Sequence, residues 1–115
     1  MNDYFSGFSE ILRKLRCTQG PAITRAARLL AEVIASGRVV HLFGSGHSVI
    51  PVLDVFPRYG SFPGFHPLMD PRLMWWNVLG PGGVKELLWL ERQEGYAAVI
   101  LESQPVARGD AMVVF

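Results

Sequence analysis

A short apolar stretch that runs directly into a small turn constrains this chain more than any other feature. Residues 38–43 (Arg-Val-Val-His-Leu-Phe) are typical of a buried strand, and residues 44–48 (Gly-Ser-Gly-His-Ser) follow at once. A strand that brings glycines and serines to the start of a helix can hold an anion, because backbone N–H groups point outward there and the helix dipole favours negative charge. The pattern therefore predicts an α/β unit with a candidate anion site in the turn.

Helical periodicity precedes this strand. Apolar residues at helical spacing over 3–16 predict an amphipathic helix. Residues 18–20 (Thr-Gln-Gly) break that pattern, and Pro21 suits the first turn of a second helix, which Gly37 would end. Two N-terminal helices are therefore expected, either as a hairpin or with the first docked on another subunit.

Beyond the turn, the spacing predicts further alternation of helices and strands. By propensity alone residues 96–101 could be a strand instead of a helix. An alternating order argues for an α/β domain with a mainly parallel sheet. The expected elements are a helix over about 48–59 that is either distorted in its last turn by Pro57 or ends early, a possible short strand within 62–67, an irregular segment over 69–83, helical pieces over 84–103 divided at Gly95, and a fully buried strand over 111–115.

Composition narrows the class of protein. Of the 115 residues 50% are apolar and 18% are charged, so the chain can bury a hydrophobic core. The net charge is +1 and no basic patch is present, so nucleic-acid binding is not supported. The lone Cys17 cannot form an intramolecular disulfide. No apolar run approaches the roughly 20 residues that span a bilayer, and the first residues lack a signal-peptide pattern. A cytoplasmic protein that binds neither nucleic acid nor membrane is expected.

The turn itself has two readings. As a phosphate or phosphosugar cradle, Gly44 and Gly46 would allow close approach of the backbone while Ser45 and Ser48 donate hydrogen bonds to oxyanions. It lacks the lysine and the length of a P-loop, so a nucleotide is not the first choice. Alternatively, one of the serines only caps the following helix. Spacing alone supports both readings equally.

The chain also resembles a known family. Residues 39–48, the segment 54–60 (Asp-Val-Phe-Pro-Arg-Tyr-Gly) and the later segments 90–97 and 109–114 resemble the SIS (sugar isomerase) domain, in particular small phosphoheptose-isomerase-like SIS proteins. The resemblance implies a flavodoxin-like three-layer sandwich with a parallel sheet. It implies one partial domain over 1–115 with a helical segment at 1–36, a helix at 96–102, sugar-phosphate binding and a homodimer or larger homo-oligomer.

The resemblance also implies roles for single residues. Ser45 and Ser48 would hydrogen-bond the phosphosugar, Gly44 and Gly46 would admit it, and His47 would lie at the mouth of the loop. Asp54 falls where the family's isomerases carry a glutamate base, although an exposed ion pair with Arg58, four residues on, is the favoured interpretation of this residue. The strand over 111–115 would lead into a second serine-rich loop, and the chain stops before that loop.

Other chemistry-bearing residues receive weaker interpretations. His41 lies in an apolar strand and is interpreted as a core histidine, while His47 and His66 could meet at one site. No metal and no cofactor are expected, because ligands in suitable spacing are missing. The remaining candidates are Glu91 with Glu94 (an acid/base pair or a solvated helix face), Trp75 with Trp76 (sugar stacking or packing) and Cys17 (structural).

Three functional hypotheses follow. The first is a phosphosugar-binding SIS-type domain whose own catalysis is doubtful. The second is an active aldose–ketose isomerase that uses Asp54 as its base within an oligomer. The third is a structural or regulatory oligomerisation module in which residues 1–36 and the Trp75–Trp76 segment form the interface and the phosphate loop has lost its role.

Overall fold

A computed structural model describes residues 2–55, 58–74, 80 and 82–115. The chain divides into two compact units between Glu32 and Val33. The first unit is helical. The second contains an open parallel sheet with helices on both faces, which confirms the predicted α/β class.

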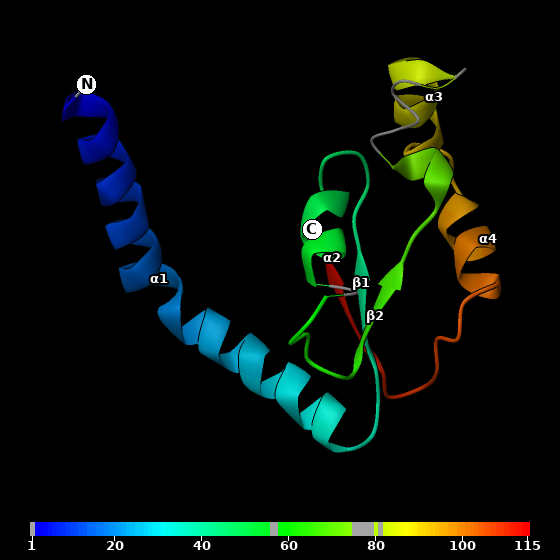
Figure 1. The fold of residues 1–115 in the computed structure, drawn as a ribbon, viewed down its shortest axis with the longest axis horizontal. Coiled ribbons are helices and arrows are strands. Elements are labelled where there is room, and N and C mark those ends of the chain that lie inside the picture. Colours follow the sequence, from blue (N-terminus) through cyan, green and yellow to red (C-terminus); the bar gives the residue numbers. More distant parts are fainter. Residues whose placement is uncertain (1, 56–57, 75–79, 81) are drawn as a thin grey trace. The chain divides into compact units, whose positions relative to one another are not determined.

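Helix α1 spans Asn2–Ala35, with Pro21 inside it. The prediction of two N-terminal helices is therefore wrong, and Figure 1 shows one helix that bends in its middle. Proline removes one hydrogen bond from a helix and kinks it, but good helix-forming residues on both sides let the helix continue. The expected apolar stripe is exposed along this helix, at Tyr4, Phe5, Phe8, Ile11, Leu12 and Leu15.

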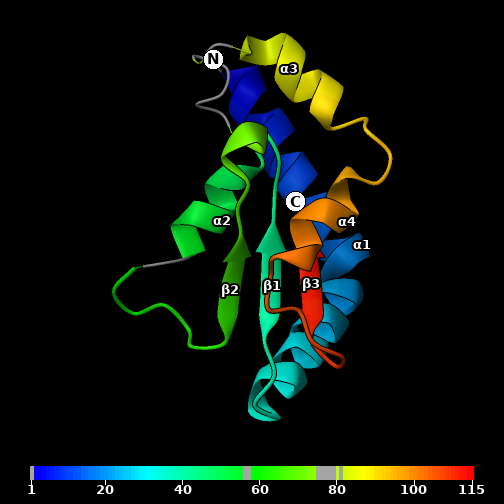
Figure 2. The ribbon, with the colours of Figure 1, turned by 90° about the vertical axis from the view of Figure 1, so that its right-hand side faces the viewer.

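The second unit is built on three parallel strands. Strand β1 (Val40–Phe43) lies between β2 (Phe65–Leu68) and β3 (Ala111–Val114), as Figure 2 shows. In register, Val40 lies opposite Phe65 on one side and Ala111 on the other. The order β2-β1-β3 means that the chain turns one way from β1 and then crosses back over it, as a doubly wound fold does.

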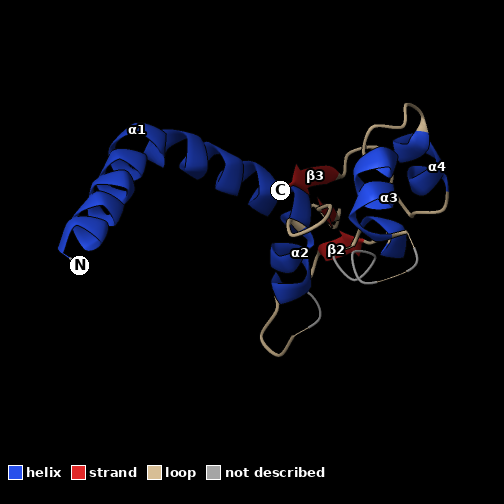
Figure 3. Cartoon of the chain, turned by 90° about the horizontal axis from the view of Figure 1, so that it is seen from above, coloured by secondary structure: helices blue, strands red, loops and turns tan. Residues whose placement is uncertain are grey.

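Helices cover both faces of this sheet. Helix α2 (Val49–Val55) lies on one side, and α3 (Gly83–Leu90) and α4 (Tyr96–Glu102) lie on the other (Figures 1 and 3). A short 3-10 helix, η1 (Pro71–Leu73), follows β2. Gly95 separates α3 from α4 and has a φ of 83°, a left-handed conformation that glycine adopts without penalty. The helical prediction for residues 96–102 is confirmed.

The core lies around β1. Val40, His41 and Leu42 are each at most 3% exposed, because β1 has a strand on either side and helices on both faces. Against the end of this strand, Phe43 and Tyr96 pack on an apolar cluster beneath α3 and α4. That cluster consists of Leu73, Leu87, Leu90 and Ile100.

The end of α2 agrees with one predicted alternative, whereas the burial of β3 needs correction. Helix α2 ends at Val55 and residues 58–60 are not helical, as expected if the helix ends early; Pro57 itself lies outside the described residues. Strand β3 is not fully buried, since its residues alternate between half-buried and exposed. The reason is that β3 lies at an edge of the sheet, where β1 is its one neighbouring strand among the described residues. Trp75 and Trp76 also lie outside the described residues.

None of the helices in the described part of the chain is both long enough and apolar enough to cross a bilayer.

Candidate functional site

The turn after β1 is tied to its surroundings through its backbone. The Gly46 N–H donates to the Leu73 carbonyl at 2.7 Å, and the Ser48 N–H donates to the Ser45 carbonyl at 3.0 Å. Within the described parts of the chain, the N–H groups of Ser45 and His47 donate to no other residue. Two backbone donors of the turn are therefore available to a ligand.

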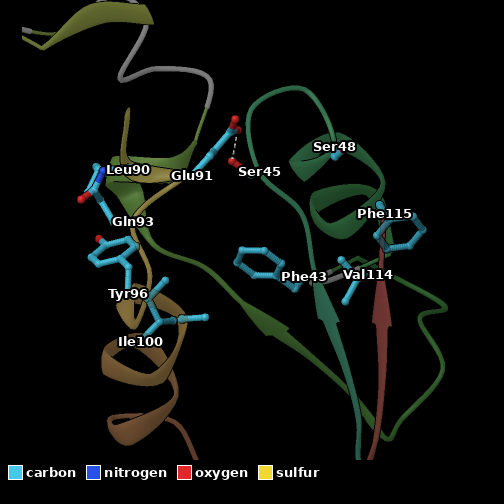
Figure 4. Close-up of a pocket in the computed structure, with 11 residues that line it drawn as sticks. Phe43, Ser45, Ser48, Leu90, Glu91, Gln93, Tyr96, Ile100, Val114 and Phe115 are labelled. Carbon is cyan, nitrogen blue, oxygen red and sulfur yellow. Dashed lines mark hydrogen bonds between the residues drawn. The ribbon is translucent and has the colours of Figure 1, made fainter. Parts of the chain in front are cut away.

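A pocket of about 400 Å³ opens beside this turn, as Figure 4 shows. Ser45 and Ser48 line it, together with Phe43 at the end of β1 and Phe115 after β3. The junction of α3 and α4 forms the opposite wall, with Glu91 and Tyr96 among its residues. The pocket thus lies at the carboxyl ends of β1 and β3, where the winding direction reverses, and doubly wound sheets bind their ligands at this place.

Glu91 joins the two walls of the pocket. It follows the last residue of α3, and its Oε1 accepts a hydrogen bond of 2.5 Å from the Ser45 hydroxyl. The dashed line in Figure 4 marks this bond. The Ser45 hydroxyl also lies 3.3 Å from the Leu73 carbonyl. A carboxylate is therefore held directly beside one of the two predicted ligand-binding serines.

Asp70 and Arg72 hold the side chain of Tyr96 in place. Its hydroxyl donates to Asp70 Oδ2 at 2.5 Å, and the Arg72 guanidinium binds both Asp70 oxygens and lies 5.1 Å from the centre of the tyrosine ring. Burial, followed by the hydrogen bond to the Asp70 carboxylate, raises the pKa of Tyr96 to about 12. Burial also raises the pKa of Asp70, but hydrogen bonds from Arg72 and Tyr96 outweigh it and leave that pKa below its usual value. Tyr96 is therefore a neutral donor fixed to Asp70.

The predicted loop residues occupy different positions. Ser45 and Ser48 line the pocket, while Gly44 and Gly46 are buried in the turn and permit its tight path. His47 is exposed and is not among the lining residues. Its predicted contact with a ligand stays a prediction.

Asp54 lies apart from the serines. It is on α2, does not line their pocket, and its Oδ1 pairs with Arg58 Nη1 at 2.9 Å. Both side chains are more than half exposed, at 72% for Asp54 and 60% for Arg58. The exposed ion pair anticipated as the alternative reading is confirmed, and a catalytic role for Asp54 stays a prediction.

The structure places His66 beside His41, not beside His47 as predicted for a shared site. His41 is buried, with its Nε2 3.1 Å from Asp110 Oδ2 and its Nδ1 3.2 Å from Nδ1 of His66. The interpretation of His41 as a hydrogen-bonded core residue is confirmed. His66 contacts His41, its register partner on the adjacent strand. Burial, and then the nearby His41, lower the pKa of His66.

Sequence reasoning missed the full role of the α3–α4 junction. The sequence pattern indicates only an acid/base pair or a solvated helix face for Glu91 with Glu94, and only a helical position for Tyr96. The order of the elements contains one signal for this role. Helices α3 and α4 connect β2 to β3, so the start of α4 lies near the carboxyl ends of the strands. A charged residue beside the Gly95 break was therefore a candidate to face the turn.

Comparison with known proteins identifies the family. A sequence model of the SIS domain family matches residues 3–115, so the chain belongs to the SIS domain family. SIS domains in general bind phosphosugars.

Curated relatives cover nearly the whole chain. A UPF0309 protein of Oceanobacillus iheyensis is 33% identical over 99% of this chain and 45% of its own length. UPF0309 proteins of Shouchella clausii and Listeria innocua are 32% and 30% identical, again over 99% of this chain and over 45% and 44% of their own lengths. The chain thus spans about 45% of the length of the first of these relatives.

Proposed function

We propose that the chain binds a phosphosugar in the pocket between the turn after β1 and the α3–α4 junction. The observation that carries this proposal is the convergence of Ser45 and Ser48 on one pocket of about 400 Å³ at the carboxyl ends of β1 and β3. Their hydroxyls and the available N–H group of Ser45 provide donors for phosphate oxygens. The volume lies within the range of small-molecule sites. Membership of the SIS domain family supports the same ligand class.

The isomerase hypothesis gains less support. Proton transfer between adjacent sugar carbons needs a base within about 3 Å of the proton. Asp54 pairs with Arg58 outside this pocket. Isomerase activity and assembly into an oligomer both stay predictions, and binding is the function proposed.

Replacing both serines by alanine tests the binding proposal. Each lost hydrogen bond to a charged phosphate weakens binding by roughly tenfold or more, so Ser45→Ala/Ser48→Ala is expected to abolish the thermal stabilisation that pentose, hexose or heptose phosphates produce. Ser36→Ala is the matched control, because the exposed Ser36 hydroxyl donates to the Val33 carbonyl and does not line the pocket. Equal stabilisation of the double variant and the wild type would refute the proposal.

A further inference from the structure

Glu91 is a carboxylate in a pocket that is proposed to receive a negatively charged phosphate. Its Oε1 accepts the Ser45 hydroxyl hydrogen at 2.5 Å. A serine hydroxyl has a single hydrogen to donate. While that hydrogen points at Glu91, it is not available to a phosphate oxygen, and the two negative groups repel each other. Glu91 therefore opposes the binding of a bare phosphate at Ser45.

The same carboxylate suits the other half of a phosphosugar. An ionised carboxylate only accepts hydrogen bonds, and sugar hydroxyls can donate them. Oε2 of Glu91 accepts no hydrogen bond from the described residues, so it has unused capacity. Tyr96 lines the same wall, and its hydroxyl hydrogen is already donated to Asp70, so it does not compete for the acceptors of Glu91. The wall at the α3–α4 junction thus offers the Glu91 carboxylate as an acceptor, while the turn offers hydrogen-bond donors.

We propose that Glu91 is a specificity-determining residue that makes the pocket prefer a phosphorylated polyol to free phosphate. This inference rests on the proposed function. When a phosphosugar binds, a sugar hydroxyl donates to Glu91 and replaces Ser45, and the released Ser45 hydroxyl donates to the phosphate. Both partners of the Ser45–Glu91 hydrogen bond are satisfied by one ligand. Free phosphate satisfies only the serine and leaves the carboxylate facing a like charge.

Glu91→Gln separates these two effects, because it removes the charge while keeping the size of the side chain. Titration calorimetry would measure binding of inorganic phosphate and of the pentose, hexose or heptose phosphate that binds the wild type most tightly. Phosphate is expected to bind about tenfold more tightly to the variant, because one repulsive charge is gone. The phosphosugar is expected to bind about tenfold more weakly, because its hydroxyl loses a charged acceptor.

Glu94→Gln is the matched control, because this substitution removes the same charge from a residue that is exposed and does not line the pocket. It is expected to leave the ratio of the two dissociation constants unchanged. If Glu91→Gln also leaves that ratio unchanged while the wild type binds a phosphosugar, the specificity role of Glu91 is refuted and the proposed function stands. If no phosphosugar binds the wild type, the proposed function is refuted, and the role of Glu91 with it.

Discussion

Two glycines of the turn are required for different physical reasons. A Cβ atom on Gly44 would lie 2.0 Å from the Ser48 carbonyl oxygen, so the chain reverses too tightly there for any side chain. Gly46 has a φ of 56°, a left-handed conformation, but a Cβ on it would be 3.7 Å from Leu87 Cδ2, its nearest neighbour. Space limits Gly44, and backbone conformation limits Gly46.

This difference predicts the effect of alanine at each position. Gly44→Ala pushes a methyl group into backbone atoms that cannot move aside, so it is expected to cost about 3 kcal/mol of the free energy of unfolding. Gly46→Ala is expected to cost about 1 to 2 kcal/mol, the penalty of a left-handed alanine. Urea unfolding of both variants measures the two values. A Gly44→Ala protein as stable as the wild type would show that the turn has a different path.

For single residues of the site, the sequence predicts some positions and not others. Ser45 and Ser48 could be selected from the sequence as candidates, because glycines and serines directly after an apolar strand suit an anion site, although a helix cap explains them equally well. The partnership of Glu91 with Ser45 could not be selected, since 46 residues separate them. Local patterns carry no information about which distant side chain crosses a pocket.

Among the elements, α1 is the clearest case in which local rules misled. Thr18, Gln19, Gly20 and Pro21 are typical of a boundary between helices, yet α1 continues through all four residues. The Thr18 and Thr24 hydroxyls donate back to the Lys14 and Gly20 carbonyls at 2.8 and 3.0 Å. Weak helix-forming residues therefore bend this helix without ending it.

Pro21→Ala is expected to strengthen the middle of α1. Alanine restores the missing N–H donor and is about 3 kcal/mol more favourable than proline inside a helix. Hydrogen–deuterium exchange of the full chain should show slower exchange of the amides around residues 17–24. Gly20→Ala, worth about 1 kcal/mol, is expected to slow the same amides less. Unchanged exchange in Pro21→Ala would contradict a continuous helix at this position.

For the whole molecule, the free energy of unfolding depends on buried titratable groups in the sheet. His41, His66 and the Asp110 carboxylate form a hydrogen-bonded chain across the start of the sheet. Hydrogen bonds from the Ala107 and Val39 N–H groups, and then from His41, lower the pKa of Asp110 to about 2. Burial lowers the pKa of His66 below 6.5. Both groups therefore favour the less protonated form in the folded protein.

The expected result is a loss of stability on acidification in two windows. As pH falls below about 6.5, the unfolded chain protonates His66 before the folded protein does, so the free energy of unfolding decreases. Below pH 3.8 the same argument applies to Asp110, whose contribution disappears as pH approaches about 2. Urea unfolding at several pH values measures both slopes.

His66→Gln separates the two windows. It is expected to remove most of the slope just below pH 6.5 and to keep the acidic one. His47→Gln, which changes an exposed histidine, is the control and is expected to keep both. If His66→Gln keeps the full upper slope, His66 is not the group responsible for it.

The sequence by itself determined the α/β class, the buried strand β1, the turn of glycines and serines after it and the helix break at Gly95. These features follow from periodicity and from backbone preferences, which act over a few residues. Only the tertiary structure decided that Glu91 contacts Ser45 and that Tyr96 lines the same pocket, that Asp54 pairs with Arg58 outside the pocket, and that β3 is half exposed at a sheet edge. The physical reason is that these outcomes depend on the order of strands and on side-chain packing between segments far apart in the chain.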